Sequence, residues 1–549
     1  MSFRTTLIAA ALSSAAATVS PGFAQQSDTP VAAAPQPQPM QVTQQGYDLY
    51  QQILTQNLTG SGIDSFYRSR KYEPFWFKSG FFGSDLAALQ TAVDAMGVAP
   101  KHGIPSFSSK MKVLAQQAQG AEDSQSRAAV DLEITKTFLE FGNAISAGVI
   151  EPRSASSEIN VTRPFKPAAK ILEAYAKAPR ADFFDRLAPQ TPEYQRLLKE
   201  RARLGGGAAE TPGPVVPAGL RPGMSGPAVQ VLRDKLTALG FAGGQGESFD
   251  AGLVAVLKQF QTSKGLGADG IPGPATLRAL NGGAAGNDSA QMRKILVNLE
   301  RQRWLNFDRG ARHIMVNLPD FTVQVVDNGR PVFSTRSVIG KSQEFQTPEF
   351  SDQMTHMVVN PTWHVPRSIA GKEYLPILQS DRGALKSRNM RLVNSAGNEV
   401  DPYGVDFSQY NASNFPYMIK QDPDPGNALG RVKFMFPNKW NIYLHDTPSK
   451  GLFNESVRAF SHGCVRLGDP FDFAYTLLAR QSSNPQGQFK SWLDTGNEKY
   501  VNLQEPVPVH ITYLTAWPQA DGSIRYLNDI YGRDAQVYRA LVNAGAPQS

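Results

Sequence analysis

The sequence contains a single cysteine, Cys464, in 549 residues. No disulfide can therefore form within the chain, and an oxidising compartment would expose the free thiol to damage. A lone cysteine in an exported chain is an intermolecular partner, a buried relic or a reactive thiol. Composition alone leaves these three interpretations open.

Long hydrophobic runs are also missing. The first apolar run, residues 6–17, is interrupted by serines and falls short of the roughly 20 residues that a membrane span needs. Arg4 precedes this run and small residues follow it at 22–24, which is the layout of a secretory signal peptide. We expect residues 1–24 to be a signal peptide, the protein to act in the periplasm, and no later segment to span the membrane.

Dense blocks of basic residues are absent as well, although the formal net charge is +7. Residues 1–24 contain Arg4 and no acidic residue, so removing them leaves +6. A mild positive excess favours anionic partners. Export argues against nucleic acid, whereas the anionic cell-wall polymer lies outside the inner membrane.

The length predicts about three folded parts. Residues 25–45 are rich in Gln, Pro and Ala and predict a disordered tether. Residues 46–203 have helical periodicity, and aromatic residues at 66–77 indicate core packing more than a sugar-binding surface. The Gly- and Pro-rich residues 204–218 predict a linker. The clearest helical stripe consists of Val130, Ile134, Phe138, Phe141 and Ile145.

Residues 219–282 predict a small unit of three helices, the first beginning near Pro227. A further helix over 288–306 suggests that this unit is inserted in the helical scaffold. Short alternating strands dominate 311–515, with a hairpin turn at 327–329. The fold class is therefore multidomain α+β, and residues 516–549 form a C-terminal tail.

Within the β-rich domain, strands are expected at 355–359, 442–445 and 507–514. The stretch between Trp363 and Lys439 is polar and lacks strong periodicity. Long irregular stretches inside a compact domain are commonly functional. We therefore expect a lid over about 366–438.

The chemistry centres on the string Ser461-His462-Gly463-Cys464-Val465-Arg466. A cysteine becomes a nucleophile when a neighbour stabilises its thiolate and lowers its pKa, and a histidine base within reach completes the minimal apparatus for acyl transfer. His445 ends a predicted strand from which its ring faces the thiol. Two alternatives stay open on residue types alone: a buried structural turn, and a zinc site formed by Cys464 with two histidines.

The spacing resembles a known signature. Fifteen residues separate His445 from Ser461-His462-Gly463-Cys464, and this is similar to the L,D-transpeptidase (YkuD-like) catalytic domain. Segments at 338–348 and 360–363 resemble further parts of this domain. Segments at 443–448, 458–461, 512–517 and 529–533 resemble its large multidomain periplasmic subgroup. Residues 66–76 and 131–152 resemble the scaffold domain of that subgroup, and the string over 220–276 resembles a three-helix peptidoglycan-binding module.

The resemblance implies a cysteine acyltransferase that forms 3→3 cross-links in peptidoglycan and is inhibited by carbapenems. Cys464 would attack a stem peptide to give a thioester, and His445 would be the base. No cofactor is expected, because the donor is an existing peptide bond. The expected partners are stem peptides and glycan, without nucleic acid. Supporting roles around the oxyanion fall to Gly463, Ser461, His462 and Arg466, and substrate binding to Arg466, Tyr443 and Trp363. For Arg466 two roles stay open: pairing with a substrate carboxylate, and packing within the fold.

Alternatives remain for the acceptor and for catalysis itself. Water as acceptor would make an L,D-carboxypeptidase, and a lysine of an outer-membrane protein would make an anchoring enzyme. A non-catalytic wall-binding protein is the alternative from another class. Asp446, next to His445, is expected to face away from it because adjacent strand residues face opposite sides. The remaining histidines are expected at the surface or in packing: His102, His313, His356, His364 and His510.

Overall fold

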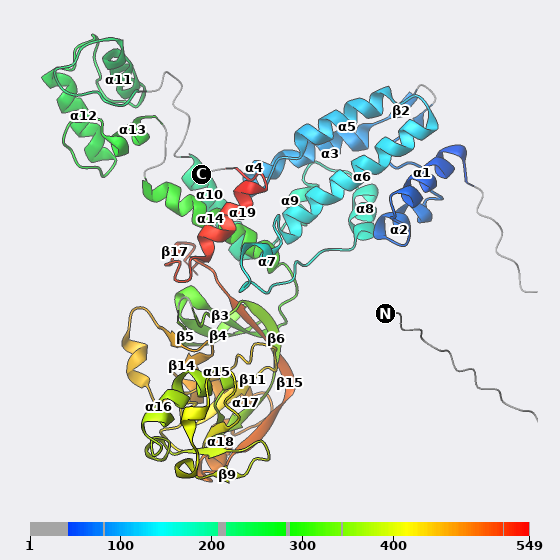
Figure 1. Ribbon diagram of the computed structural model, residues 1–549. Helices are drawn as coiled ribbons and strands as arrows, with labels where there is room; N and C mark the ends of the chain where they lie inside the picture. The colour runs from blue at the N-terminus through cyan, green and yellow to red at the C-terminus, as the bar shows by residue number, and fades with distance from the viewer. Residues whose placement is uncertain are drawn as a thin grey trace, which may run out of the picture.

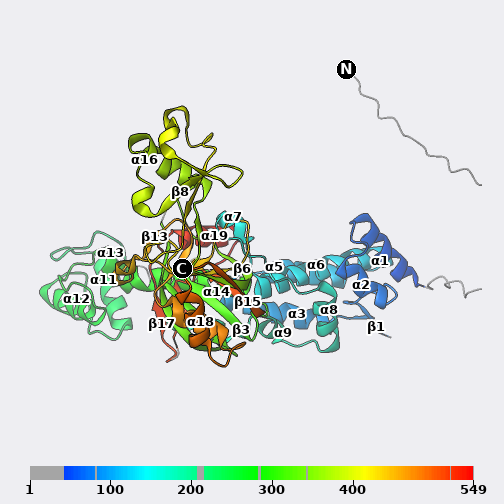
Figure 2. The same ribbon diagram turned by 90° about the horizontal axis from the view of Figure 1, so that it is seen from below.

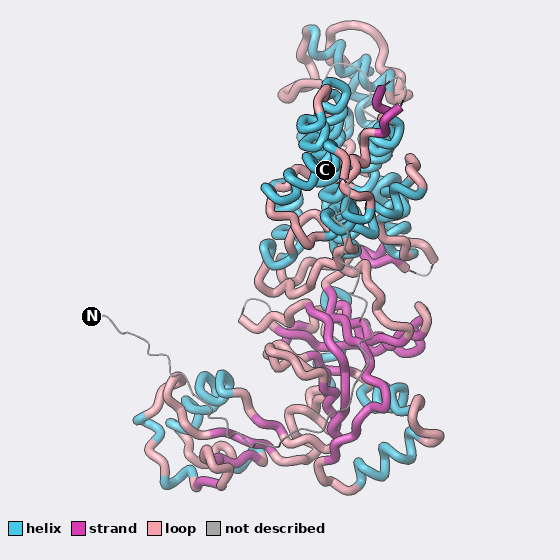
Figure 3. Tube along the Cα trace, turned by 90° about the vertical axis from the view of Figure 1, so that its right-hand side faces the viewer, coloured by secondary structure: helices cyan, strands magenta, loops and turns pink. Residues whose placement is uncertain are grey.

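The structure is a computed structural model that describes residues 42–80, 83–206, 216–281, 286–341, 344–519 and 521–547. The predicted signal peptide and nearly all of the predicted tether lie outside the described residues, as does the centre of the predicted linker, 207–215. Helices gather at one end of the molecule and strands at the other (Figure 3). Within the described residues, no helix is both long and apolar enough to cross a membrane.

A helical scaffold occupies the N-terminal part (Figure 1). Its centre is α6 (Ser124–Ala147), which starts where the Asp123 side chain accepts the Ser126 N–H. The aromatic cluster packs in the core as predicted: Trp76 is fully buried, and its indole N–H donates to Thr135 of α6 at 2.8 Å. The other scaffold elements are α1 (Gln44–Thr55), α2 (Gly62–Ser69), β1 (Lys78–Gly80), β2 (Gly83–Asp85), α3 (Ala87–Ala95), α4 (Ala99–His102), α5 (Ser108–Gly120), α7 (Pro152–Ala155), α8 (Ala168–Lys177), α9 (Phe183–Leu187) and α10 (Pro192–Gly206).

The small unit consists of α11 (Pro227–Ala238), α12 (Ala251–Ser263) and α13 (Pro274–Leu280) around its own apolar core. Gln261 is buried in it and holds the following loop: its amide N–H groups donate to Asp269, Ile271 O and Thr276, and its amide oxygen accepts the Gly270 N–H. The two ends of the unit meet where Val216 and Asn281 exchange two hydrogen bonds. The chain then enters α14 (Gly286–Trp304), which packs on α10.

The β-rich domain is a nine-stranded sheet with the order β13-β5-β14-β12-β11-β6-β15-β3-β4. The first half of β5 pairs with β4 and its second half with β14 and β13, so the sheet closes on itself. The predicted hairpin is confirmed between β4 and β5. The strands are β3 (Arg312–Asn317), β4 (Thr322–Asp327), β5 (Arg330–Gly340), β6 (Phe350–Val359), β11 (Val432–Met435), β12 (Leu444–His445), β13 (Ala459–Ser461), β14 (Val465–Leu467) and β15 (Lys499–Thr512), covered by helices α17 (Pro470–Leu478) and α18 (Pro485–Asp494).

The segment predicted as a lid differs from the expectation in form and in extent. It folds as a compact subdomain that projects from the closed sheet (Figure 2) and has its own apolar core. Its small sheet has the order β7-β10-β8-β9. The subdomain therefore begins at β7, before residue 366, and it ends before β11, which belongs to the main sheet. The predicted range 366–438 is thus not a single insertion. Its elements are β7 (Trp363–His364), α15 (Arg367–Ile369), a π-helical turn (Ala370–Tyr374), α16 (Leu375–Ser380), β8 (Met390–Val393), β9 (Glu399–Val400) and β10 (Met418–Gln421).

The C-terminal residues return to the scaffold. After β16 (Ala516–Pro518) and β17 (Ile524–Tyr526), helix α19 (Arg533–Asn543) packs on α14 and α7. Buried ion pairs fix this junction: Arg301 of α14 binds Asp534, and Arg533 binds Glu349 at 2.9 Å. Glu349 directly precedes β6, so these two ion pairs connect the scaffold, the tail and the closed sheet.

Candidate active site

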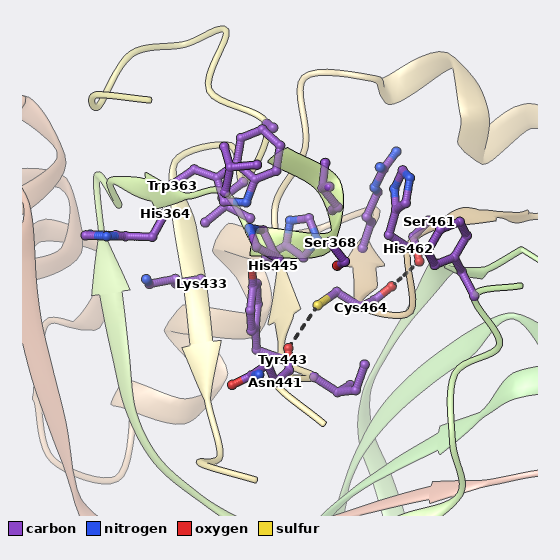
Figure 4. A pocket seen from close by; sticks show the side chains of 18 of the residues that line it. Trp363, His364, Ser368, Lys433, Asn441, Tyr443, His445, Ser461, His462 and Cys464 are labelled. Atoms are coloured by element: carbon purple, nitrogen blue, oxygen red, sulfur yellow. Dashed lines mark hydrogen bonds between the residues drawn. The ribbon is translucent and has the colours of Figure 1, made fainter. Parts of the chain in front are cut away.

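A cavity of about 680 Å³ opens between the closed sheet and the projecting subdomain. Strands β11, β12 and β14 form one wall, and β7 with the helical turns after it forms the other (Figure 4). Seven of the eight residues that the sequence assigned to the site line it: Trp363, Tyr443, His445, Ser461, His462, Cys464 and Arg466. Gly463 lies in the turn beneath them.

The turn before β14 is built around its serine and glycine. Ser461 Oγ accepts the Gly463 N–H at 3.1 Å and donates to the Cys464 carbonyl. Gly463 has φ +111°, a conformation that residues with a Cβ rarely adopt, and its carbonyl accepts a hydrogen bond from Thr347 Oγ1 at 2.7 Å. These bonds hold the turn so that the Cys464 side chain faces the cavity.

The thiol of Cys464 donates weakly to the Asn441 carbonyl at 3.5 Å. Burial raises the pKa of Cys464 to about 11, and hydrogen bonds with Tyr443 and the charge of Arg466 offset only part of this effect. This direction is opposite to the lowered pKa that the sequence led us to expect for a nucleophilic thiol. The physical reason is that desolvation of the sulfur outweighs the single nearby cation.

His445 is 4% exposed, and its Nδ1–H donates to the Asp446 carbonyl at 2.5 Å. This bond assigns the proton to Nδ1 and leaves Nε2 as the free base. Burial, followed by the charge of Arg466, lowers the pKa of His445 to about 3, so the ring is neutral. Figure 4 shows the ring and the Cys464 side chain facing the same cavity, without a hydrogen bond between them in the described structure.

Asp446 orients His445 only through its backbone. Its carboxylate accepts hydrogen bonds from the Arg431 and Thr447 N–H groups, and Lys450 Nζ lies 2.6 Å from it. The side chain thus faces away from the imidazole, as the strand geometry predicted.

His462 joins the two walls of the cavity. Its Nε2 lies 2.6 Å from the Glu373 carboxylate of the projecting subdomain, and its ring packs on Phe345 with centroids 4.6 Å apart. Because both contacts hold the ring in place, His462 is suited to orient the turn and not to act as the base.

Several residues that line the cavity were not predicted from the sequence. Lys433, Glu373 and Asn441 reach the site from β11, the π-helical turn and a loop, far from the cysteine motif in sequence. The alternation of Val432 and Phe434 around Lys433 is a signal that could have indicated a strand presenting that lysine. His364 also lines the cavity and is exposed, which agrees with the expectation of a surface residue.

The other histidines lie outside the cavity. His102 contacts Tyr194 and Asp185, and His510 contacts Ser351. For a metal, no group of three or more His, Cys, Asp or Glu side chains in a suitable arrangement occurs among the residues the structure describes.

Fold and site together define a multidomain protein whose closed β-sheet presents a cysteine–histidine pair to a cavity. Residues 311–503 match the L,D-transpeptidase catalytic domain, residues 61–200 match the scaffold domain, and residues 225–280 match the "Putative peptidoglycan binding domain". The chain therefore carries an L,D-transpeptidase catalytic domain together with a scaffold domain and a peptidoglycan-binding domain, as its motifs predicted.

Parts of the chain are similar to a curated relative and to several solved structures. A "Putative L,D-transpeptidase" of Haemophilus influenzae is 32% identical over 251 residues, which is 46% of this chain and 50% of that relative. This chain thus spans about half the length of the relative. Among solved structures, an L,D-transpeptidase from Mycobacterium smegmatis is 12% identical with a TM-score of 0.18, and the match covers 37% of this chain and 58% of that one. One from Xylanimonas cellulosilytica (residues 123–326) is 14% identical with a TM-score of 0.14, covering 55% and 99%.

Proposed function

We propose that this protein is a periplasmic L,D-transpeptidase that forms 3→3 cross-links in peptidoglycan through a thioester on Cys464. The observation that carries the proposal is the placement of a thiol and a neutral imidazole in one cavity of an L,D-transpeptidase catalytic domain. The peptidoglycan-binding domain supports the polymer as the partner.

In the acylation step, Cys464 Sγ attacks the carbonyl that joins the third stem residue to the terminal D-alanine. Because the thiol pKa is raised and the His445 pKa is lowered, the pair starts neutral. His445 Nε2 accepts the thiol proton as the C–S bond forms, and it gives this proton to the D-alanine nitrogen as the C–N bond breaks. The products are the thioester and free D-alanine.

Stabilisation of the oxyanion falls to the Cys464 backbone. The Gly463 N–H already donates to Ser461 Oγ, so it does not face an incoming carbonyl. The Cys464 N–H has no protein acceptor in the described structure and is the natural donor to the developing oxyanion. Ser461 and Gly463 then support catalysis by shaping the turn.

In the deacylation step, an amine on the third residue of a second stem attacks the thioester. His445 Nε2 accepts a proton from this amine and returns it to the departing sulfur, which restores the starting state. Water in place of the amine would give an L,D-carboxypeptidase, and a lysine of an outer-membrane protein would give an anchoring enzyme. Trp363 and Tyr443, which line the cavity, are proposed to contact the stem peptides.

The raised thiol pKa and the peptidoglycan-binding domain both fit a non-catalytic wall-binding protein. The raised pKa does not exclude catalysis, because a neutral imidazole removes the proton during attack and a standing thiolate is not required. The two readings differ in one measurable property, namely covalent chemistry at Cys464.

The experiment is mass spectrometry of products after mixing residues 25–549 with a disaccharide-tetrapeptide, beside Cys464→Ala and His445→Gln. We expect a dimer of two monomers minus one alanine with the wild type only. Tripeptide without dimer would identify a carboxypeptidase. No product, together with no carbapenem adduct on Cys464, would contradict the proposal and leave the binding protein.

A further inference from the structure

Three cavity side chains form a row across neighbouring strands. Lys433 of β11 is the antiparallel partner of His445 of β12, and His445 is the parallel partner of Arg466 of β14. Directly paired residues project on the same face of a sheet, and all three residues line the cavity. Since neighbouring strands lie about 4.8 Å apart, one cation flanks the proposed base on each side.

Neither cation has a partner within the described structure. Lys433 makes no side-chain hydrogen bond or ion pair there, although its side chain is half-buried and the charge of Glu498 acts on it. The Glu498 carboxylate instead accepts the Thr362 N–H at 2.6 Å. Arg466 Nε is buried without an acceptor.

Among the described lining residues, no unpaired carboxylate is available to these cations. Glu373 is the only acidic residue among the described lining residues, and it is held by His462. Burying a cation without a partner is costly. An anionic group of a ligand would therefore supply the counter-ion that these two cations lack.

We propose that Lys433 binds the terminal carboxylate of the donor stem peptide and makes the enzyme selective for a stem that ends at the fourth residue. The inference rests on the proposed function, which places the D-alanine nitrogen within hydrogen-bond reach of His445. The carboxylate of D-alanine is two bonds from this nitrogen, so it lies within one strand spacing of His445. Lys433 occupies this position on the β11 side.

Lys433 is assigned in preference to Arg466 because of where the nucleophile lies. Cys464 precedes β14 by one residue and approaches from the Arg466 side of His445. In the tetrahedral intermediate, the leaving nitrogen occupies another corner of the carbon that the sulfur has attacked, and it faces His445, which protonates it. The rest of D-alanine then extends past His445 toward β11. A stem with a fifth residue has an amide where this carboxylate would be, and the amide leaves Lys433 without a counter-ion.

The test compares two disaccharide-tetrapeptides, one ending in D-alanine and one in D-alaninamide, by kcat/KM for release of the fourth residue. We expect the wild type to prefer the acid by about 10- to 100-fold, in line with a charge-assisted hydrogen bond. Lys433→Met should lower kcat/KM for the acid by this factor and leave the amide within about twofold. Lys433→Arg should keep part of the preference, and the matched control Lys420→Met, from a strand outside the cavity lining, should keep all of it.

Three results would overturn the assignment. A Lys433→Met variant that keeps the preference shows that Lys433 does not read the carboxylate. Equal losses on both substrates show that it acts on His445 or on folding. If the preference is lost in Arg466→Met and kept in Lys433→Met, Arg466 binds the terminal carboxylate in place of Lys433.

If the wild type releases nothing from either peptide, the proposed function fails separately. Calorimetric binding of the same two peptides to Cys464→Ala and to Cys464→Ala/Lys433→Met then decides the inference. Tighter binding of the acid that depends on Lys433 supports it, and equal binding contradicts it.

Discussion

At the scale of single residues, burial moves the two reacting groups in opposite directions. It raises the pKa of the Cys464 thiol to about 11 and lowers the pKa of His445 to about 3. Both shifts favour the neutral forms, because desolvation penalises whichever form is charged. The resting pair is thus a thiol beside a free base, and it differs from the thiolate–imidazolium pair of a cysteine activated in advance.

This state predicts slow alkylation of Cys464 at neutral pH. With a pKa of about 11 in place of the ordinary 9.0, the thiolate fraction at pH 7 is roughly 100-fold lower. We expect the rate with iodoacetamide to rise about tenfold per pH unit from pH 7 to 10. Because Cys464 is the only cysteine, the same chain unfolded in urea is the control. A plateau of the native rate below pH 8 would show an activated thiolate.

At the scale of elements, very short strands and one contact shape the site. Strands β12 and β14 have only two and three residues, yet their register places His445 between Lys433 and Arg466. The opposite wall is tied to the cysteine turn by Glu373 and His462. The exposed fractions of these two side chains are 44% and 26%, so the tie is partly screened by solvent.

Breaking this tie is expected to loosen the projecting subdomain. Glu373→Ala should speed hydrogen exchange over residues 367–380 by about two- to fivefold, consistent with up to about 1 kcal/mol for a half-exposed ion pair. The matched control is Glu344→Ala, which removes the exposed pair of Lys372 with Glu344. Equal effects of the two substitutions would show that the His462 contact has no special role.

At the scale of the whole molecule, buried histidines link stability to pH. In the closed-sheet domain the pKa of His445 is lowered to about 3 and that of His510 to about 4, and burial lowers the pKa of His313 as well. Below the ordinary pKa of 6.5, the unfolded chain therefore binds more protons than the folded chain. The free energy of unfolding must fall as the pH falls from about 6.5 toward 4.

Groups with raised pKa values act in the opposite direction. Burial raises the pKa of Glu349, at the edge of the closed sheet. Its effect on the free energy of unfolding therefore changes with pH in the direction opposite to that of the three histidines. In the scaffold, Asp131, with a pKa raised to about 6, offsets His102, with a pKa lowered to about 4. We expect acidification from pH 6.5 to 4.5 to destabilise the closed-sheet domain by on the order of 1–2 kcal/mol per pH unit and the scaffold by less. Hydrogen exchange resolved by domain measures both, and a scaffold that opens first contradicts the assignment.

The sequence by itself determined the features that short segments carry. The bonds of Ser461 inside the Ser-His-Gly-Cys turn join residues within three positions of each other. The stripe of α6 and the hairpin at 327–329 depend on local periodicity and turn chemistry. Gln261 belongs to the same class, because its bonds reach residues no more than fifteen positions away.

Only the tertiary structure decided how the site is charged and enclosed. The row Lys433–His445–Arg466 exists because β11, β12 and β14 are neighbours in the closed sheet, and the Glu373–His462 contact spans 89 positions of sequence. The predicted lid appeared irregular because its strands are short and its core is small. The raised pKa of Cys464 could not be predicted either, since desolvation depends on every segment that packs around the sulfur and not on the residues beside it in the chain.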